Sequence, residues 1–344
     1  MRVLVTGHRG YIGSVVATVL RHARFEVVGL DCDLYAGCDF GRTHHPVPSF
    51  DIEVREVEFT DLLPFDAVIH LAAMPAELCD ADSGRDFFGV DEETSHRLAE
   101  CSKKASVARF LFASTCDVYG RVGRALCDEH YPTSPMGEAA ESKLRCEELL
   151  TNLADRSFTP TILRIPEVYG VSPQMRLEPL VNEFTASAVV SGRVQIDGDA
   201  SAWRSLIHVE DLARACAALL ATDDETKQPG VCNMADADAA YRVVDIADAV
   251  TEQIPHVVRS TPRHAYDAPS CRADGSKFAR LFPKFAFRWT LEAGIRQLAS
   301  AFASAGLTPG EYRSDRYRRL MKLRSSKRVA LSHSVFRRRE PSAA

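Results

Sequence analysis

The chain has 344 residues, of which 46% are hydrophobic and 26% are charged, and its formal net charge is −5. This composition is ordinary for a globular protein and excludes a chain that is disordered over most of its length. No stretch approaches the roughly 18 uninterrupted apolar residues of a membrane-spanning helix, and no apolar leader precedes the first predicted strand. We therefore expect a cytoplasmic protein with two lobes, because the length exceeds that of one small core.

The ten cysteines are scattered, and no two of them have the two-residue spacing that is typical of zinc or redox sites. We therefore expect free thiols in a reducing compartment and no metal site. The cysteines are Cys32, Cys38, Cys79, Cys101, Cys116, Cys127, Cys146, Cys216, Cys232 and Cys271.

The short apolar runs of the first 170 residues alternate with amphipathic stretches. The apolar runs predict strands at residues 2–5, 26–30, 67–71, 109–113 and 161–163. The amphipathic stretches predict helices at residues 12–21, 95–104 and 142–153. This alternation is typical of an α/β fold of the Rossmann type, a doubly wound parallel sheet with crossover helices. Beyond residue 170 the order is irregular, with predicted helices at 177–190 and 209–221, which favours a smaller mixed α/β lobe.

The last part of the chain is basic. Residues 311–344 carry 11 Lys and Arg against 3 Asp and Glu. A basic tail can bind nucleic acid or an anionic surface. This one has few aromatic residues that could stack on bases, and it has a helix-like apolar stripe of Tyr317, Leu320, Met321 and Leu323. We expect a docking helix or a solvated terminus, and neither a nucleic acid nor a membrane as partner.

The first predicted strand runs into a glycine-rich turn, Gly7-His8-Arg9-Gly10-Tyr11-Ile12-Gly13. Glycines permit a tight turn and close approach of the backbone to a pyrophosphate, and the following helix N-terminus favours anions. Asp31 ends the second strand, 18 residues after Gly13. A carboxylate there accepts hydrogen bonds from ribose hydroxyls and repels a 2′-phosphate. The turn and the acid together predict NAD, rather than NADP, as cofactor.

Further motifs follow in order: DAVIHLAA at residues 66–73, STCDVYG at 114–120, SK at 142–143 and WRSLIHVED at 203–211. With glycines spaced G-x-x-G-x-x-G, the chain resembles the extended short-chain dehydrogenase/reductase family over about residues 1–295. Within that family it is most similar to NAD-dependent nucleotide-sugar epimerases and dehydratases. The resemblance implies an NAD-binding Rossmann domain at 1–170, a substrate-binding lobe at 171–310 and a basic C-terminal tail at 311–344.

The resemblance also assigns roles to individual residues. Thr115 would hydrogen-bond the reacting sugar hydroxyl, and Lys143 would bind the nicotinamide ribose and lower the pKa of a catalytic tyrosine. The acid near the adenine corresponds to Glu53 or Asp51, and the sequence leaves both registers open. The cofactor set is Gly7, Gly10, Tyr11, Ile12, Gly13, Asp31, Glu53, Val54, Leu71, Ala72, Ala73, Lys143, Pro166 and Val168. The substrate set is Met74, Thr115, Arg176, Asn182 and Arg204, with Arg204 on the diphosphate of a nucleotide sugar.

The catalytic tyrosine itself is missing from its expected position. It should stand four residues before Lys143, so that the phenol and the ammonium share one face of a helix. Ala139 occupies that position, and a methyl group cannot take a proton. Tyr119, Tyr131 and Tyr169 lack this spacing. The sequence leaves open whether Ala139 is natural or was introduced in place of a tyrosine.

Three acidic residues also depart from the epimerase pattern. Asp91 and Glu167 stand where the family usually has asparagine, and Glu167 would repel a diphosphate if it faced the pocket. Sugar 4,6-dehydratases place an Asp-Glu pair directly after the threonine, where this chain has Cys116-Asp117. Asp117 is therefore either a catalytic acid or base or a turn-capping carboxylate.

The function that we predict is an NAD-dependent nucleotide-sugar epimerase of carbohydrate biosynthesis, active as a homodimer. It would act at C4 through a keto-sugar and would be impaired by Ala139. Two alternatives remain from the sequence. One is a catalytically dead module that binds NAD and a nucleotide sugar, and the other is a nucleotide-sugar 4,6-dehydratase that uses Asp117.

Overall fold

A computed structural model describes residues 1–41, 47–73, 84–222, 230–236, 238–260, 269–319 and 321–322, with the backbone alone for 84–90. Its centre is a seven-stranded parallel sheet with the strand order β11-β7-β5-β4-β1-β2-β3. The strands are β1 (Arg2–Thr6), β2 (Glu26–Leu30), β3 (Ser49–Phe50), β4 (Ala67–His70), β5 (Arg109–Thr115), β7 (Thr161–Ile165) and β11 (Val231–Asn233).

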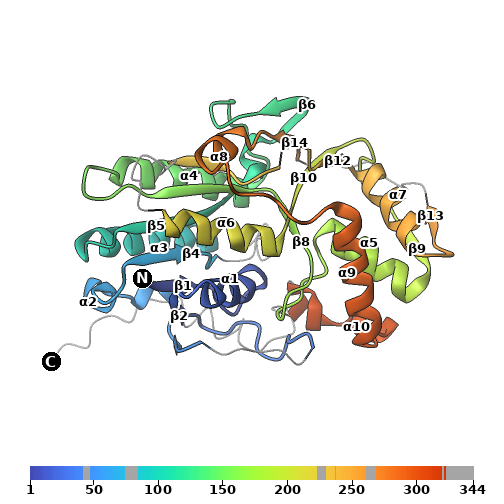
Figure 1. Cartoon of the computed structure of the whole chain (residues 1–344), viewed down its shortest axis with the longest axis horizontal. Coiled ribbons are helices and arrows are strands. Elements are labelled where there is room, and N and C mark those ends of the chain that lie inside the picture. Colours follow the sequence, from blue (N-terminus) through green and yellow to red (C-terminus); the bar gives the residue numbers. More distant parts are fainter. Residues whose placement is uncertain are drawn as a thin grey trace.

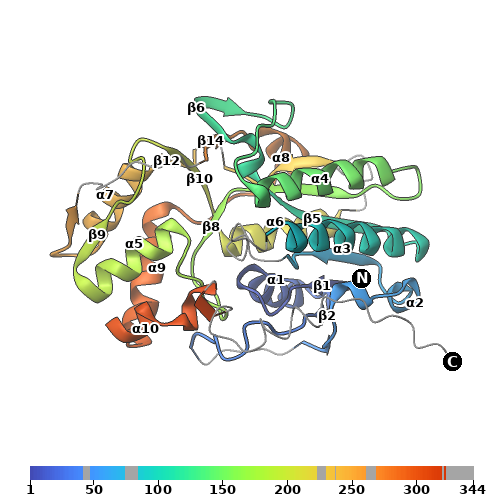
Figure 2. The same cartoon turned by 180° about the vertical axis from the view of Figure 1, so that it is seen from behind.

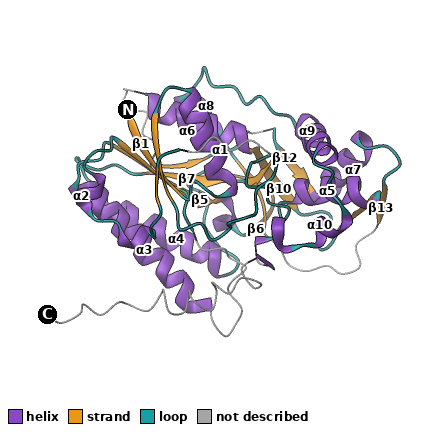
Figure 3. Ribbon diagram, turned by 90° about the horizontal axis from the view of Figure 1, so that it is seen from below, coloured by secondary structure: helices purple, strands orange, loops and turns teal. Residues whose placement is uncertain are grey.

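Helices cover both faces of this sheet, as the doubly wound prediction requires (Figures 1 and 3). One core includes Val3 and Val5 of β1 with apolar residues of α1 (Tyr11–His22) and α6 (Val209–Ala221). The other core includes Phe110 and Phe112 of β5 with residues of α3 (Gly84–Lys104) and α4 (Glu138–Leu153). Strands that are apolar on both faces can be buried only in such a sandwich of layers. The predicted fold class is confirmed.

A smaller lobe stands at one end of the sheet (Figure 2). It contains a three-stranded sheet of β8 (Glu167–Tyr169), β10 (Trp203–His208) and β12 (Ala240–Arg242). A strand pair, β9 (Arg193–Gln195) and β13 (Val258–Ser260), lies beside it. Its helices are α5 (Leu180–Ser191), α7 (Val243–Gln253), α9 (Leu291–Ser304) and α10 (Pro309–Arg313). A second pair joins β6 (Arg121–Cys127) and β14 (Ser270–Ala273), followed by α8 (Ser276–Leu281).

The chain does not divide cleanly at residue 170. After β8, β9 and β10, it returns to the large lobe with α6, which packs beside α1, and with β11, which pairs with β7. Two predicted helix boundaries also shift. Pro179 caps α5, so that helix starts at Leu180, and Gly137, with a φ of 87°, precedes α4, which starts at Glu138. In the described part of the chain, no helix meets the length and apolar composition of a membrane span.

A buried ion pair links the α4 helix to the central sheet. The carboxylate of Glu147 accepts hydrogen bonds from the Arg164 guanidinium, with Nη2 at 2.7 Å from Oε2, and from the Ser114 hydroxyl. The two charged side chains are only 4% and 6% exposed. Arg164 also donates to the Tyr119 hydroxyl at 3.0 Å, and Tyr119 donates to Asn233 at 2.7 Å. The network therefore joins α4, β5, β7 and β11.

We expect Glu147→Gln to reduce the free energy of unfolding by about 3–5 kcal/mol, because it leaves the Arg164 charge buried without a counter-charge. Urea denaturation followed by circular dichroism measures the change. Arg145→Gln is the matched control: it breaks the pair with Glu92 at the surface (2.7 Å), which contributes about 0–1 kcal/mol. Equal midpoints for Glu147→Gln and the unchanged protein would contradict this account.

Candidate active site

The glycine-rich turn lies between β1 and α1, as predicted. Gly7 has a φ of 71°, and its N–H donates to the Leu30 carbonyl at 2.8 Å. A Cβ on Gly7 would stand 2.8 Å from the Ala72 nitrogen, and one on Gly13 would collide with the Gly7 oxygen. Both positions therefore require glycine. A Cβ on Gly10 would meet one neighbour, the Gly7 oxygen at 3.0 Å, so this side of the turn is less crowded, as the close approach of a pyrophosphate requires.

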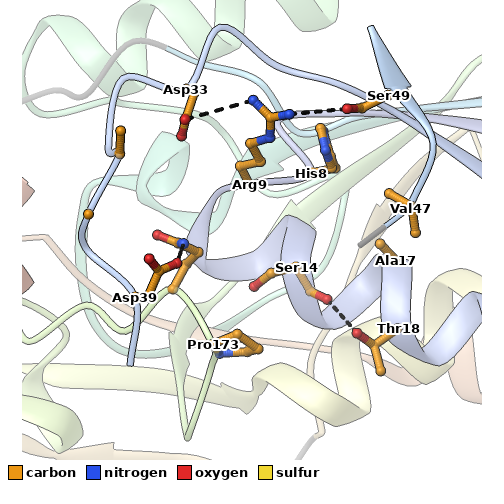
Figure 4. Close-up of a pocket in the computed structure, with 13 residues that line it drawn as sticks. His8, Arg9, Ser14, Ala17, Thr18, Asp33, Asp39, Val47, Ser49 and Pro173 are labelled. Carbon is orange, nitrogen blue, oxygen red and sulfur yellow. Dashed lines mark hydrogen bonds and ion pairs between the residues drawn. The ribbon is translucent and has the colours of Figure 1, made fainter. Parts of the chain in front are cut away.

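Asp31 is fixed in place at the end of β2. Its two carboxylate oxygens accept the N–H groups of Arg9 and Asp33, each at 2.9 Å. The Arg9 guanidinium lies 2.5 Å from Asp51 and 3.8 Å from Asp33 (Figure 4). Two carboxylates thus balance the charge of Arg9, which leaves little of it for a 2′-phosphate. The site fits NAD, the cofactor predicted from Asp31.

Glu53 and Val54 lie close to this end of the sheet. Glu53 is paired with Arg55 at 2.6 Å, and it precedes a short 3-10 helix, η1 (Val54–Glu56). Burial raises the pKa of the Cys32 thiol to about 11, and the charges of Asp31 and Glu53 contribute to the rise. Glu53 therefore stands near Asp31, whereas Asp51 is engaged with Arg9. Both acids remain candidates for the adenine contact.

A cavity of about 450 Å³ opens between the glycine turn and the small lobe. It brings together residues that are far apart in the sequence but were predicted to share a site. These are Tyr11, Ile12, Thr115, Asp117, Pro166, Val168, Arg176 and Arg204, and Glu167 joins them. Trp203, Glu178, Leu180, Pro269 and Cys271 also line the cavity, and no sequence motif had singled out their side chains.

Thr115 and Asp117 meet at the carboxyl end of β5. The Thr115 hydroxyl oxygen accepts the Asp117 N–H at 3.1 Å, which caps the 3-10 helix η3 (Cys116–Tyr119). The Asp117 side chain is exposed to the cavity but surrounded by protein. This desolvation raises the pKa of its carboxyl group, and the positive charge of Arg204 opposes the rise. Asp117 does not cap the turn through its side chain here, because Thr115 does.

Glu167 faces the cavity beside Arg204. Its Oε2 lies 3.6 Å from the Arg204 Nε, and its Oε1 accepts the Leu180 N–H. Desolvation raises the pKa of this carboxyl group, and Arg204 and Arg176 oppose the rise. Arg204 additionally donates to the carbonyls of Trp203, at 3.2 Å, and Pro269. Glu167 thus partly balances the arginine that was predicted to bind a diphosphate.

Lys143 lies at the carboxyl ends of β4 and β5. Its Nζ is 4.9 Å from the centre of the Phe112 ring. Burial lowers the pKa of His70 to about 3, and the charge of Lys143 contributes to this. His70 directly precedes Leu71, Ala72 and Ala73, the expected cofactor trough. The position predicted for Lys143 is therefore compatible with a cofactor contact, although this side chain is not among the described residues that line the 450 Å³ cavity.

Ala139 stands in the first turn of α4, one helical turn before Lys143. The nearby tyrosines are used elsewhere, as their spacing predicted. Tyr119 belongs to the Glu147–Arg164 network, Tyr131 packs edge-on against it at 6.4 Å, and Tyr169 donates to the Thr290 carbonyl at 3.2 Å. None of the three is among the described residues that line the cavity.

Asn182 does not line the cavity but lies fully buried behind its wall. Its side-chain oxygen accepts the Gly170 N–H at 3.0 Å, and its amide donates to the Tyr11 hydroxyl at 3.0 Å and the Arg176 carbonyl at 2.9 Å. The amide is thus occupied in supporting two residues that do line the cavity. The predicted direct substrate contact is replaced by this supporting role. Met74 lies outside the described residues.

Two other predictions concern metals and Asp91. Among the residues that the structure describes, no group of three or more His, Cys, Asp or Glu side chains could hold a metal ion. Asp91 lies on α3 near Cys146, whose pKa is raised mainly by burial, to about 11, with a contribution from the Asp91 charge.

Comparison with known proteins decides the family. The profile of the NAD dependent epimerase/dehydratase family matches residues 3–235. The chain belongs to the NAD-dependent epimerase/dehydratase family. UDP-glucose 4-epimerase of Yersinia pestis is 27% identical over 308 residues, which cover 81% of this chain and 91% of that protein.

Solved structures of this family share the fold. TunA, described as an NAD-dependent NDP-hexosamine 5,6-dehydratase of tunicamycin biosynthesis, superimposes with a TM-score of 0.77 at 24% identity, covering 88% of this chain and 98% of TunA. MoeE5 in complex with UDP-glucuronic acid and NAD gives a TM-score of 0.71 at 25% identity, covering 89% and 100%. NAD is the cofactor of the family, and the family includes both epimerases and dehydratases.

Asp31→Asn tests the cofactor site. The unchanged protein should bind NAD more tightly than NADP by about tenfold or more, because placing a carboxylate against a 2′-phosphate costs several kcal/mol. The variant should lose most of this preference. Isothermal titration with both dinucleotides measures it, with Asp197→Asn, an exposed aspartate beyond β9, as control. Equal affinities in the unchanged protein would remove the role assigned to Asp31.

Proposed function

We propose that the protein is an NAD-dependent nucleotide-sugar epimerase that acts at C4 through a transient keto-sugar, and that Ala139 impairs its proton transfer. One observation carries this proposal. Tyr11 and Ile12 of the glycine turn, Thr115 and Arg204 line the same cavity. A dinucleotide on the turn and a sugar beside Thr115 would therefore be neighbours. The similarity to a UDP-glucose 4-epimerase supports the choice of C4 and of a UDP-sugar.

The residues of the cavity suit a nucleotide sugar in different ways. The Thr115 hydroxyl can bond to the reacting sugar hydroxyl. Arg204 can bind the diphosphate with its guanidinium fork, as arginine does in many phosphate sites. Glu167 lies 3.6 Å from Arg204, and its raised pKa favours the neutral form, which reduces repulsion of the diphosphate. Arg176 adds positive charge on the same wall.

The step that this chain lacks is removal of the sugar hydroxyl proton. NAD, when bound, accepts a hydride from the sugar carbon and returns it to the opposite face. Loss of the hydride requires loss of the hydroxyl proton, which a positioned base takes. Thr115 and Lys143 are both in place, but Ala139 offers no group that can accept a proton. We therefore propose binding of both ligands with slow turnover or none.

Ala139→Tyr should restore turnover by a factor on the order of 10² to 10⁴, the usual contribution of a positioned acid or base. Ala139→Phe is the matched control, because it adds the same ring without the hydroxyl. Product formation from a panel of UDP-sugars, followed by chromatography and mass spectrometry, measures the effect. NAD affinity should change little, since Gly7, Gly13 and Asp31 are untouched.

Two outcomes would count against this proposal. Rapid epimerisation by the unchanged protein would show that another residue is the base. Silence from the unchanged protein and the Ala139→Tyr variant alike, with NAD and sugar nucleotide bound, would favour the alternative of a binding module without catalysis.

A dehydratase is the second candidate, and the position of Asp117 favours it. Its carboxyl group faces the cavity next to Thr115, and its raised pKa favours the protonated form that can donate to a leaving hydroxyl. The partner glutamate or aspartate of a 4,6-dehydratase pair is replaced by Cys116. The same product analysis separates the two reactions, because a dehydratase product is lighter by one water and an epimer has unchanged mass. A homodimer and a cytoplasmic location stay predictions.

A further inference from the structure

The basic C-terminal region, which the proposed reaction does not use, docks against the cofactor lobe. The segment in question is residues 315–319, which we call the C-terminal segment. It begins with a short 3-10 helix, η5 (Asp315–Tyr317), and it lies beside the loop that follows β2 in two opposite views (Figures 1 and 2). Tyr317 is 4% exposed and Arg319 is also 4% exposed. The sequence-based expectation of a docking element is met by Tyr317, whereas Met321 is 43% exposed.

Three side chains of this segment contact the loop at residues 32–40, which we call the cofactor loop. Arg316 donates from Nη2 to the Asp39 carbonyl at 2.8 Å. The Tyr317 ring packs edge-on against Phe40, with centroids 5.7 Å apart. The Arg319 guanidinium lies 3.9 Å from the centre of the Tyr35 ring. The contacts are spread over the loop from Tyr35 to Phe40.

The same segment also contacts the wall of the 450 Å³ cavity. The Leu177 N–H donates to the Tyr317 carbonyl at 3.0 Å. Arg319 donates from its backbone N–H to the Glu178 carboxylate at 2.5 Å and from Nη2 to the Gln174 carbonyl at 3.1 Å. Gln174 in turn donates to Asp39 at 2.7 Å, which closes the circuit to the cofactor loop (Figure 4). The segment is therefore wedged between the two binding regions.

Arg319 is the critical member because its charge is buried. Its Nη1 has no hydrogen-bond partner among the described residues, and burial lowers its pKa. The face of the Tyr35 ring therefore supplies much of its stabilisation, since a cation over an aromatic ring gains most when both are withdrawn from water. If the cofactor loop moved away, Arg319 would lose this contact.

The cofactor loop matters for NAD because of where it begins. It directly follows Asp31, and its Asp33 lies 3.8 Å from Arg9 of the glycine turn. We propose that the C-terminal segment is a positioning element for the cofactor, in which Arg319 holds Tyr35 and thereby keeps the cofactor loop closed against the glycine turn, so that bound NAD is retained. This goes beyond the proposed sugar reaction, because it concerns NAD binding alone.

The test is a double-mutant cycle on the full chain, with NAD as the only ligand. Arg319→Ala and Tyr35→Leu should each raise the Kd of NAD about tenfold, which corresponds to about 1.4 kcal/mol. The double variant should be no weaker than the weaker single variant, because both changes remove the same contact. Arg313→Ala, an exposed arginine of α10, and Tyr35→Phe, which keeps the ring, are the matched controls and should stay within about twofold of the unchanged protein.

Thermal unfolding without NAD separates positioning from general stability. The coupling between residues 35 and 319 should be larger in the Kd of NAD than in the unfolding of the NAD-free protein. Tyr35→Leu lies on a loop and keeps the test available even if Arg319→Ala folds poorly. Unchanged NAD affinity in the folded single variants, or strictly multiplicative effects in the double variant, would overturn the proposal. Failure of the epimerase assignment would appear only with sugar nucleotides and would leave these results intact.

Discussion

The buried pair of Glu147 and Arg164 is the interaction on which the site depends. Two opposite charges that are almost removed from water are tolerable only if they meet with good geometry. Here Glu147 lies on α4, the helix that carries Ala139 and Lys143, and Arg164 lies on β7, shortly before Pro166 and Glu167. Ser114, next to Thr115, donates to the same carboxylate. We infer that this one pair sets the position of α4 relative to the strand ends from which the cavity is built.

The cavity wall continues this logic in the small lobe. Tyr11 closes it from the cofactor side, and Asn182 holds Tyr11 and Arg176 together through one buried amide. Arg204 and Glu167 share the opposite wall. The charge of the cavity is therefore nearly balanced, with arginines and carboxylates side by side, which makes ligand binding sensitive to the protonation of Glu167 and Asp117. That balance distinguishes this chain from the asparagine-containing pattern it otherwise resembles.

Much of this could be predicted from the sequence, and the reason is locality. The parallel sheet follows from alternating patterns within 20 or so residues, and the glycine turn, Asp31, Thr115 and Arg204 lie in short motifs. The rest depends on contacts that no local pattern carries. Asn182 was predicted to contact substrate because its partners Gly170, Arg176 and Tyr11 cannot be read from its neighbours. Cys271 reaches the cavity because β14 pairs with β6, and Arg319 reaches Tyr35 across most of the chain.

The central claim is that the site is built for proton transfer and lacks the proton acceptor at position 139. Chemical rescue tests it most directly. Turnover of UDP-sugars by the unchanged protein would be measured with and without added phenol, a free form of the missing side chain. The account predicts that turnover rises with the phenol concentration and that the Ala139→Phe variant, whose ring fills the space, does not respond. Turnover that is fast without phenol and indifferent to it would contradict the account.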